Sequence, residues 1–183
     1  MNKNSFESKE EYQDGKYRIV SISNGSTNLR RVICDVDGIC LVPFDTLNGK
    51  IKNVYLARYV DYLSNDQGHT CIISDFKENT DTLFEELHEL VNVELGVDAD
   101  VNDLYFLGNI NHNLPFSKTY KCYGLNLDNH SKDLNGFSLD LSDEEKDNKL
   151  YSLDKIKLTR ILKGDIEDSL TMSAALLLIS YVE

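Results

Sequence analysis

The sequence predicts an α+β domain, an α/β/α sandwich in which a mixed β-sheet lies between helices. Three observations lead to this prediction. Short apolar runs typical of strands open the chain, one amphipathic helix follows them, and further strands lead to a terminal helix. Asn48-Gly49 favours a hairpin turn between two of the opening strands. The strand-like segments are YRIVSIS, RRVICDVDGICLVPFD, NVYLARYVDYL, DLYFLGNI and TYKCYGLNL.

The central helix has the clearest pattern in the sequence. Asn79-Thr80-Asp81 supplies candidates for its N-cap, and Gly96 is a candidate C-cap. Between these caps, apolar residues recur at spacings of one, three and four, so one helix face should pack in the core. These residues are Leu83, Phe84, Leu87, Leu90, Val91 and Leu95. The last helix should lie in DIEDSLTMSAALLLISYVE, where Asp165 or Asp168 can act as the cap.

The length and composition predict one domain. The chain has 183 residues, of which 41% are hydrophobic and only two are proline, and this is enough for a sizeable core. Residues 1–15 are polar and charged without a period, so we expect a flexible N-terminal arm followed by a single domain over residues 16–183. The most apolar segment, Met172 to Val182, is too short to cross a bilayer.

The charge and the cysteines restrict the classes of partner and site. A net charge of -12 argues against nucleic acid as a partner, because binding to phosphate backbones depends on basic surfaces. The four cysteines stand singly, with no CxxC pair, so the sequence indicates neither a zinc site nor a disulfide framework. Reduced thiols in a cytoplasmic protein are the expectation for Cys34, Cys40, Cys71 and Cys122.

Four segments, taken together and in this order, resemble the Nudix hydrolases, and in particular the branch that cleaves ADP-ribose and related nucleoside diphosphate sugars. The resemblance covers roughly residues 17 to 180 and implies a Nudix-like mixed sheet flanked by helices. It rests on VICDVDGICLVPFDTLNGKIKNVYLARYVDYL, on Asp75 to Val97 in the place of the Nudix box, on YFLGNINHNLPFSKTYKCYGLNLD, and on KLYSLDKIKLTRILKGDIEDSLTMSAALLLIS.

The stretch HELVNVELGV, residues 88–97, keeps the spacing of the Nudix box but few of its residues. The family pattern is G-x5-E-x7-R-E-U-x-E-E-x-G-U, with U an aliphatic residue. With its last two positions on Gly96 and Val97, it begins at Asp75, and Asp81 takes the first glutamate position. The arginine position then falls on Glu89, and the three following glutamates on Leu90, Val93 and Glu94. A rival alignment of His88-Glu89-Leu90 with R-E-U recovers Glu89 but places the glutamate pair on Asn92 and Val93.

These departures bear on the chemistry that the resemblance implies. Positions three and four residues apart share one helix face, so three glutamates there would converge on a magnesium ion, which polarises phosphate and activates water. Here that face carries Leu90, Val93 and Glu94, one carboxylate beside two aliphatic side chains. Thr119, in the later loop where this branch often carries an acidic residue, cannot act as a carboxylate base. The resemblance therefore implies a Nudix fold with a degenerate metal site.

Three functions remain open on this evidence. The leading hypothesis is a non-catalytic binding, structural or assembly module that needs no cofactor. The first alternative is an active magnesium-dependent pyrophosphatase of ADP-ribose-like compounds, and the second is a nucleotide sensor without turnover. Remnant ligands for the active case are Glu94 and Glu89, with Glu86 and Glu85 as further candidates. A solvated helix face is nevertheless the favoured interpretation of these glutamates.

Other polar and aromatic residues have a functional and a structural interpretation. Arg30, Arg31 and Arg58 could meet a phosphate, but salt bridges at strand edges are favoured. A base could stack on a strand tyrosine such as Tyr55, whereas surface tyrosines also suit a protein interface. The polar N-terminus and the charged segment Asn129 to Asn148 could order on a protein partner or in a larger assembly. No metal-ligand spacing links His69, His88, His112 and His130.

Overall fold

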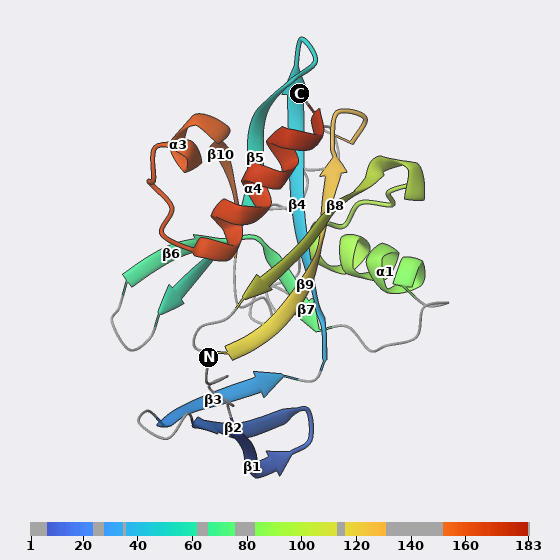
Figure 1. Cartoon of the computed structure of the whole chain (residues 1–183). Helices are drawn as coiled ribbons and strands as arrows, with labels where there is room; N and C mark the ends of the chain where they lie inside the picture. Colours follow the sequence, from blue (N-terminus) through green and yellow to red (C-terminus); the bar gives the residue numbers. More distant parts are fainter. Residues whose placement is uncertain are drawn as a thin grey trace, which may run out of the picture.

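The computed structural model describes residues 7–23, 28–34, 36–61, 66–75, 83–112, 116–130 and 152–182. Figure 1 shows the arrangement of their strands and helices. The first strands are β1 (Glu7–Asp14), β2 (Tyr17–Ser23), β3 (Asn28–Cys34), β4 (Gly38–Leu47), β5 (Lys50–Asp61), β6 (Asp66–Thr70) and β7 (Ile72–Asp75). The later elements are α1 (Leu83–Leu95), a 3-10 turn (Val101–Asp103), β8 (Leu104–His112), β9 (Phe116–Asn126), β10 (Ser152–Lys157), α3 (Leu158–Leu162) and α4 (Ser169–Val182).

The main sheet is mixed, as the sequence predicted. Its central strands follow the order β8, β9, β4, β5, β10, in which β4 and β9 run parallel and the other neighbours are antiparallel. One edge of β4 has two partners: β7 pairs with residues 38–41, and β5 pairs with residues 44–47. Beyond this point β5 pairs with β6. The long strands β4 and β5 meet at the Asn48-Gly49 turn, where both residues have positive φ, 56° and 75°.

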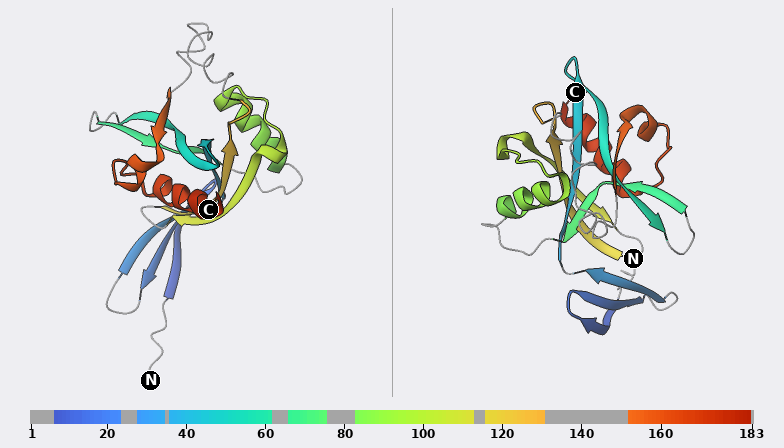
Figure 2. Two further views of the ribbon diagram at one scale, coloured as in Figure 1. Left: turned by 90° about the horizontal axis from the view of Figure 1, so that it is seen from above. Right: turned by 180° about the vertical axis from the view of Figure 1, so that it is seen from behind.

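Helices cover the two faces of this sheet, which gives the three layers of a sandwich (Figures 1 and 2). Side chains alternate across a strand, so β4 contributes Cys40, Val42 and Phe44 to the core beneath α4 and Ile39 and Leu41 to the core beneath α1. The remaining residues of the first core come mainly from α3, α4, β5 and β10, and those of the second from α1 and β9. The α+β fold class is therefore confirmed.

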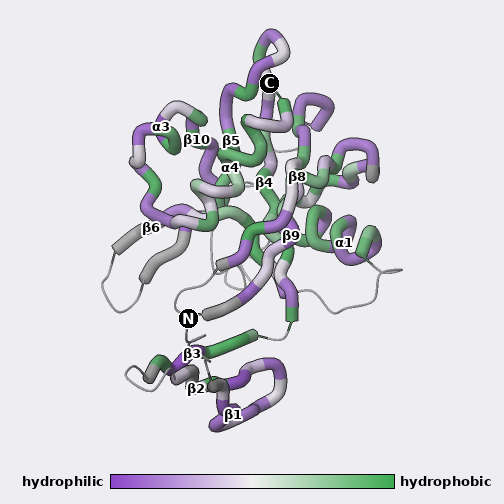
Figure 3. The backbone as a smooth tube through the Cα atoms, viewed as in Figure 1, coloured by the Kyte–Doolittle hydropathy of each residue, from purple (hydrophilic) through white to green (hydrophobic). Residues whose placement is uncertain are grey.

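The strands β1, β2 and β3 form a small antiparallel sheet beside this body. It joins the main sheet through β3 and β9, which pair in parallel at Val32 with Phe116 and at Ile33 with Ser117. The expectation of a flexible arm over residues 1–15 is wrong for residues 7–14, which form β1. This strand carries no apolar period and is hydrophilic along most of its length in Figure 3. Its order comes from backbone pairing with β2, which the sequence pattern does not reveal. Residues 1–6 lie outside the described residues.

Asp75 connects the small sheet to the body. Its two carboxylate oxygens pair with Lys16, in the β1–β2 turn, and with Lys118 of β9. The Lys118 side chain is 9% exposed and its ammonium lies 5.2 Å from the centre of the Tyr120 ring. Gly38 leaves the space for that ring, since an added Cβ would overlap it. The joint therefore depends on Asp75 and on the glycine beneath Tyr120.

The ends of the two main helices follow the sequence signals where these can be compared. Gly96 has φ 61° and donates its N–H to Asn92 O, as expected of a C-cap after α1. Of the two acidic candidates before α4, Asp168 accepts a hydrogen bond from Thr171 N at 2.9 Å and is the cap. The N-cap candidates Asn79 to Asp81 lie outside the described residues.

Candidate functional site

The surface around α1 is where the sequence placed a candidate metal site. Leu87, Val91 and Leu95 form its fully buried stripe, because they recur every four residues along the face that meets the sheet. Leu90 lies at the edge of this stripe and packs against the same core. Val93 points the other way, and 60% of its surface is exposed. Of the two aliphatic residues at the ligand positions, Leu90 therefore contributes to the core and Val93 faces solvent.

The four candidate glutamates lie along two different sides of α1. Glu85 and Glu89 are exposed and one helical turn apart, on the side away from the buried stripe. Glu86 and Glu94 are half-buried and flank Leu90, but they are eight residues apart, which is about 12 Å along the axis. The structure therefore places Glu85 and Glu86 each about one turn from Glu89, and keeps Glu94 more than one turn from all three.

This arrangement of donors does not fit a magnesium ion held by the helix. Magnesium needs several oxygen ligands in near-octahedral geometry. Among the described residues, no group of three or more histidine, cysteine, aspartate or glutamate side chains could hold a metal ion. Asp75, at the start of the box alignment, is engaged with Lys16 and Lys118. Asp81, at the first glutamate position, lies outside the part of the chain that the structure describes.

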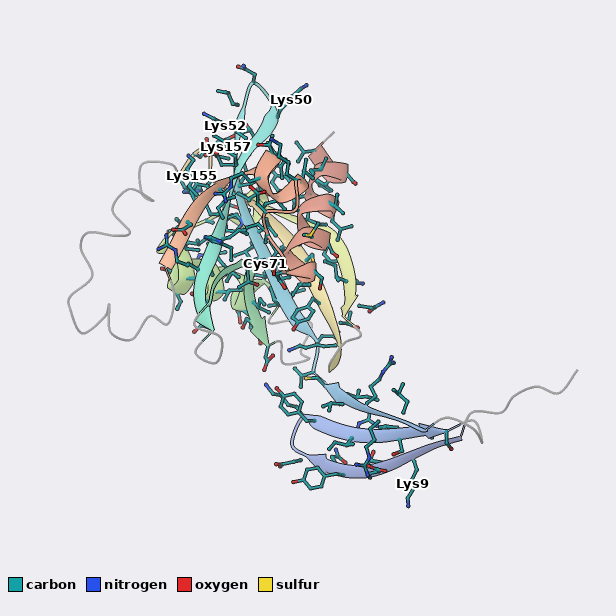
Figure 4. All side chains as sticks on the ribbon, turned by 90° about the vertical axis from the view of Figure 1, so that its left-hand side faces the viewer. Lys9, Lys50, Lys52, Cys71, Lys155 and Lys157 are labelled. Atoms are coloured by element: carbon teal, nitrogen blue, oxygen red, sulfur yellow. The ribbon has the colours of Figure 1, made fainter. Side chains whose placement is uncertain are left out.

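A second polar group lies across the end of the sheet, on the side that α1 covers. We call Asp45, Asn53, Tyr55 and Lys155 the Asp45 cluster. The carboxylate of Asp45 accepts hydrogen bonds from Asn53 Nδ2 at 2.7 Å and from the Tyr55 hydroxyl at 3.0 Å. It also pairs with Lys155 Nζ at 2.6 Å. Figure 4 shows Lys155 among lysines that gather around β5 and β10, the others being Lys50, Lys52 and Lys157.

The Asp45 cluster is electrostatically satisfied. Burial raises the pKa of Asp45, but the hydrogen bonds from Lys155, Asn53 and Tyr55 outweigh it and hold that pKa below its ordinary value. The same contact with Asp45 raises the pKa of Lys155. A carboxylate with a lowered pKa is a weak general base, so the cluster is built to stay ionised. The sequence alone does not reveal this cluster, because Asp45 and Lys155 are far apart in the chain and meet only through the pairing of β4, β5 and β10.

The arginines considered for phosphate binding have carboxylate partners. Arg58 forms two hydrogen bonds with Asp154, at 2.7 and 2.5 Å, and His69 Nε2 lies 2.8 Å from the same carboxylate. Arg30 pairs with Glu11 at 2.9 Å. The favoured interpretation, salt bridging between strands, is confirmed for both arginines. A phosphate at Arg58 would compete with its two hydrogen bonds to Asp154.

The described histidines and Thr119 also have local partners. His88 Nε2 lies 3.0 Å from Asp98, and His130 Nε2 lies 3.1 Å from Asp103. Thr119 donates its hydroxyl hydrogen bond to Asn111 Oδ1 at 3.0 Å. The Tyr55 ring is 9% exposed and packs in the core beneath α1, so it offers no open face for a base.

Comparisons with known proteins identify the fold. No family model matches the sequence, and no curated protein matches it. Among solved structures, the chain matches the crystal structure of an ADP compounds hydrolase with a TM-score of 0.64 and 14% identity, over 100% of this chain and 95% of that chain. A complex of the C-terminal domain of mouse MUTYH with human PCNA matches with a TM-score of 0.37 and 19% identity, over 51% of this chain and 62% of that chain.

The match to the hydrolase extends over the full chain, so it includes the sheet and both covering helices. At 14% identity it is evidence for the fold alone. Among the described residues, no helix is long and apolar enough to span a membrane. The chain has a Nudix-like α+β fold.

Proposed function

We propose that this protein is a Nudix-fold binding or assembly module that does not hydrolyse nucleotides. The observation that supports the proposal is the arrangement of carboxylates on α1. Leu90 packs in the core, Val93 exposes an aliphatic side chain, and Glu94 is about 12 Å along the axis from Glu86. A hydrolase that works through a divalent cation needs several such groups around one ion.

The fold remains suited to binding. Charged side chains at its edges form local pairs such as Arg58–Asp154 and the Asp45 cluster, which fix the strands without any ligand. Tyrosines are exposed on the small sheet, with Tyr12 at 58% and Tyr17 at 44%. Tyrosine is enriched in protein interfaces, so a protein partner or a larger assembly is the proposed context. The segment Asn129 to Asn148, considered above for partner binding, lies mostly outside the described residues.

The decisive experiment combines metal binding with turnover on one sample. Magnesium and manganese are titrated calorimetrically into the full chain, with and without ADP-ribose, and the same sample is then assayed for release of AMP. We expect no metal-dependent release of AMP. The variants Glu94→Gln and Glu89→Gln should behave like the unchanged protein in both measurements.

A result that contradicts the proposal is equally clear. Metal-dependent release of AMP that disappears in Glu94→Gln or Glu89→Gln would show that displaced carboxylates still hold an ion. Glu85→Gln serves as the matched control, because Glu85 lies on the same helix but on the side away from Glu94. If AMP release disappeared in all three variants alike, Glu85 would be needed for the activity as well, and this result would also contradict the proposal.

The second candidate function is hydrolysis of ADP-ribose-like compounds with magnesium. It is favoured by one observation, the likeness over the whole chain to an ADP compounds hydrolase. A third, a sensor that binds such a nucleotide without turnover, would show itself as thermal stabilisation by ADP-ribose with no product, because a ligand that binds only the folded state raises its apparent stability.

A further inference from the structure

Three cysteines meet in the core beneath α4. Cys40 of β4, Cys71 between β6 and β7, and Cys122 of β9 are each 0% exposed and belong to the same core. Cys40 and Cys122 are direct neighbours across the parallel strands. The Sγ atoms of Cys40 and Cys71 lie 3.1 Å apart. Cys34 lies elsewhere, on β3, with its Sγ 3.5 Å from Val36 O.

Cys71 has polar neighbours that Cys40 lacks. Its backbone N–H donates to Thr171 Oγ1 at 2.7 Å, and that hydroxyl in turn bonds Asp168. The Thr70 hydroxyl lies 4.0 Å from Cys71 Sγ. Figure 4 places Cys71 inside the body, beside α4. The first turn of α4 therefore rests directly on this residue.

The two thiols differ in acidity. The hydrogen bond from Cys40 stabilises a thiolate at Cys71, and although burial opposes it, the pKa of Cys71 lies below its ordinary value. Hydrogen bonds to Cys122 and Cys71, together with burial, raise the pKa of Cys40. A pair in which one thiol favours the thiolate and the other lies within van der Waals contact has an attacking and a resolving member.

We propose that Cys71 and Cys40 form a thiol-oxidation site that a hydroperoxide converts into a disulfide beneath α4. With hydrogen peroxide as the oxidant, the first step begins when the Cys71 thiol releases its proton and the thiolate attacks one peroxide oxygen. The O–O bond breaks, and the departing hydroxide takes up that proton to become water. Cys71 is now a sulfenic acid. In the second step Cys40 loses its proton and attacks Cys71 Sγ, and the sulfenic hydroxyl leaves as a second water. Two thiols have been oxidised and one peroxide reduced.

The geometry brings Cys71 Sγ within 3.1 Å of Cys40 Sγ. A disulfide bond is about 2.05 Å long, so the two Sγ atoms need to approach by only about 1 Å. The bond would join β4 to the residue just before β7, two segments already held in place by pairing of β4 with β7. Because both sulfur atoms are fully buried, oxidation requires a brief opening of the α4 first turn and favours a small oxidant.

The test is a cysteine map of the full chain. The folded protein is treated with hydrogen peroxide, remaining thiols are blocked after denaturation, and the chain is cleaved before aspartate without reduction. This cleavage separates the four cysteines into peptides 14–34, 37–44, 66–74 and 103–127. We expect 37–44 joined to 66–74, with loss of two hydrogen atoms, and release of both by a thiol reductant.

Other outcomes overturn the proposal. The first is a disulfide between peptides 37–44 and 103–127, that is, between Cys40 and Cys122. The second is Cys71 oxidised to sulfinic or sulfonic acid without a disulfide. The third is blocking of all four thiols, which would mean that no cysteine was oxidised. The map needs no variant, so it remains decisive even if a substitution in the core prevents folding. In the urea-unfolded chain the selectivity for this pair should be lost, whereas Cys34→Ser should leave the pair unchanged.

The rate at which the disulfide between Cys40 and Cys71 forms tests whether the oxidant enters by opening of the first turn of α4. Asp168→Ala removes the cap of α4 and leaves both cysteines in place, so more frequent opening should accelerate formation of the link several-fold. The matched control, Asp165→Ala, removes an acidic side chain that lies in the loop before α4 and pairs with Arg160, and it should leave the rate unchanged. Equal rates in the two variants would contradict access through the α4 first turn.

Discussion

Asp154 joins three strands through its two carboxylate oxygens. It lies on β10 and accepts hydrogen bonds from Arg58 of β5, while one of the same oxygens lies 2.8 Å from Nε2 of His69 on β6. Burial raises the pKa of Asp154, but these partners outweigh burial, so the net pKa lies below its ordinary value. The sequence offered Arg58 as a possible phosphate ligand, and could not reveal that its partner lies on a strand 96 residues further along the chain.

Asp154→Asn should lower the free energy of unfolding at pH 7 by about 1 kcal/mol, because the charge-assisted hydrogen bonds are lost at a partly exposed site. The folded-state pKa lies below the ordinary value of 3.8, so this stabilisation is present above that value and is lost as pH falls through the folded-state pKa. The difference between variant and unchanged protein should therefore shrink below pH 4. Urea unfolding across pH measures it, and a difference that grows towards acid would contradict this account.

Gly38→Ala should destabilise the protein by about 1–3 kcal/mol, as overpacking does elsewhere. The added methyl would overlap the Tyr120 ring and come within 2.9 Å of Lys118 Cε. Thermal or urea unfolding measures the loss. Gly49→Asn is the control, because Gly49 has open space around it and asparagine tolerates its positive φ. A comparable loss in both variants would refute a steric cause.

At the scale of elements, α1 shows what a sequence pattern can and cannot predict. The apolar spacing predicted a helix ending at Gly96, and the buried stripe of Leu87, Val91 and Leu95 confirms it. The same pattern could not tell that Phe84 and Val93 are exposed, at 58% and 60%, because this depends on which strands lie beneath the helix. The loss of metal ligands on α1 could be predicted from the sequence, because aliphatic residues stand at ligand positions. The Asp45 cluster could not be predicted, because its residues meet only through the pairing of β4, β5 and β10.

Leu87→Ala should cost about 2–5 kcal/mol of unfolding free energy, the range for truncating a fully buried leucine. Val93→Ala, on the exposed side of the same helix, should cost less than about 0.5 kcal/mol. Urea unfolding of the two variants compares the two sides of α1. Equal costs would contradict the exposure of Val93 and the burial of Leu87.

Asp168→Ala should destabilise the protein by about 1–2 kcal/mol, because Asp168 caps α4 and also accepts a hydrogen bond from the Thr70 hydroxyl at 3.2 Å. Asp165→Ala should change stability by less than about 0.5 kcal/mol, since its pair with Arg160 is exposed. Thermal unfolding distinguishes the two acidic residues that the sequence left as alternatives. A larger loss for Asp165→Ala would contradict the capping assignment.

At the scale of the whole molecule, the small sheet and the body meet through few contacts. Two residue pairs join β3 to β9, and Asp75 adds ion pairs to Lys16 and Lys118. The sequence predicted β2 and β3 from their apolar residues but not β1, because pairing along a polar strand leaves no apolar alternation to detect. The fold class could be predicted from the order of elements. The joint formed by Lys16, Asp75 and Lys118 could not, because these residues are far apart in the chain.

Asp75→Asn should loosen the small sheet without unfolding the body. Amide hydrogen exchange in β1 and β2 should become faster, while exchange in the β4–β5 hairpin should stay unchanged, because the second region keeps its own strand pairing and both cores. Exchange followed by mass spectrometry reports both regions in one experiment. Uniform acceleration over the whole chain would show that Asp75 supports global stability instead.

The parallel pairing of β4 with β9 has a consequence for how the chain folds. The β1–β2 and β4–β5 hairpins join neighbouring segments and close short loops, so they can form early. The centre of the main sheet must wait until β9 is in place, because it brings together strands separated by residues 48–115. During synthesis, the edges of β3 and β4 that pair with β9 stay open until β9 emerges. The chain therefore carries exposed strand edges for much of its production, and its yield should depend on how fast that last pairing forms.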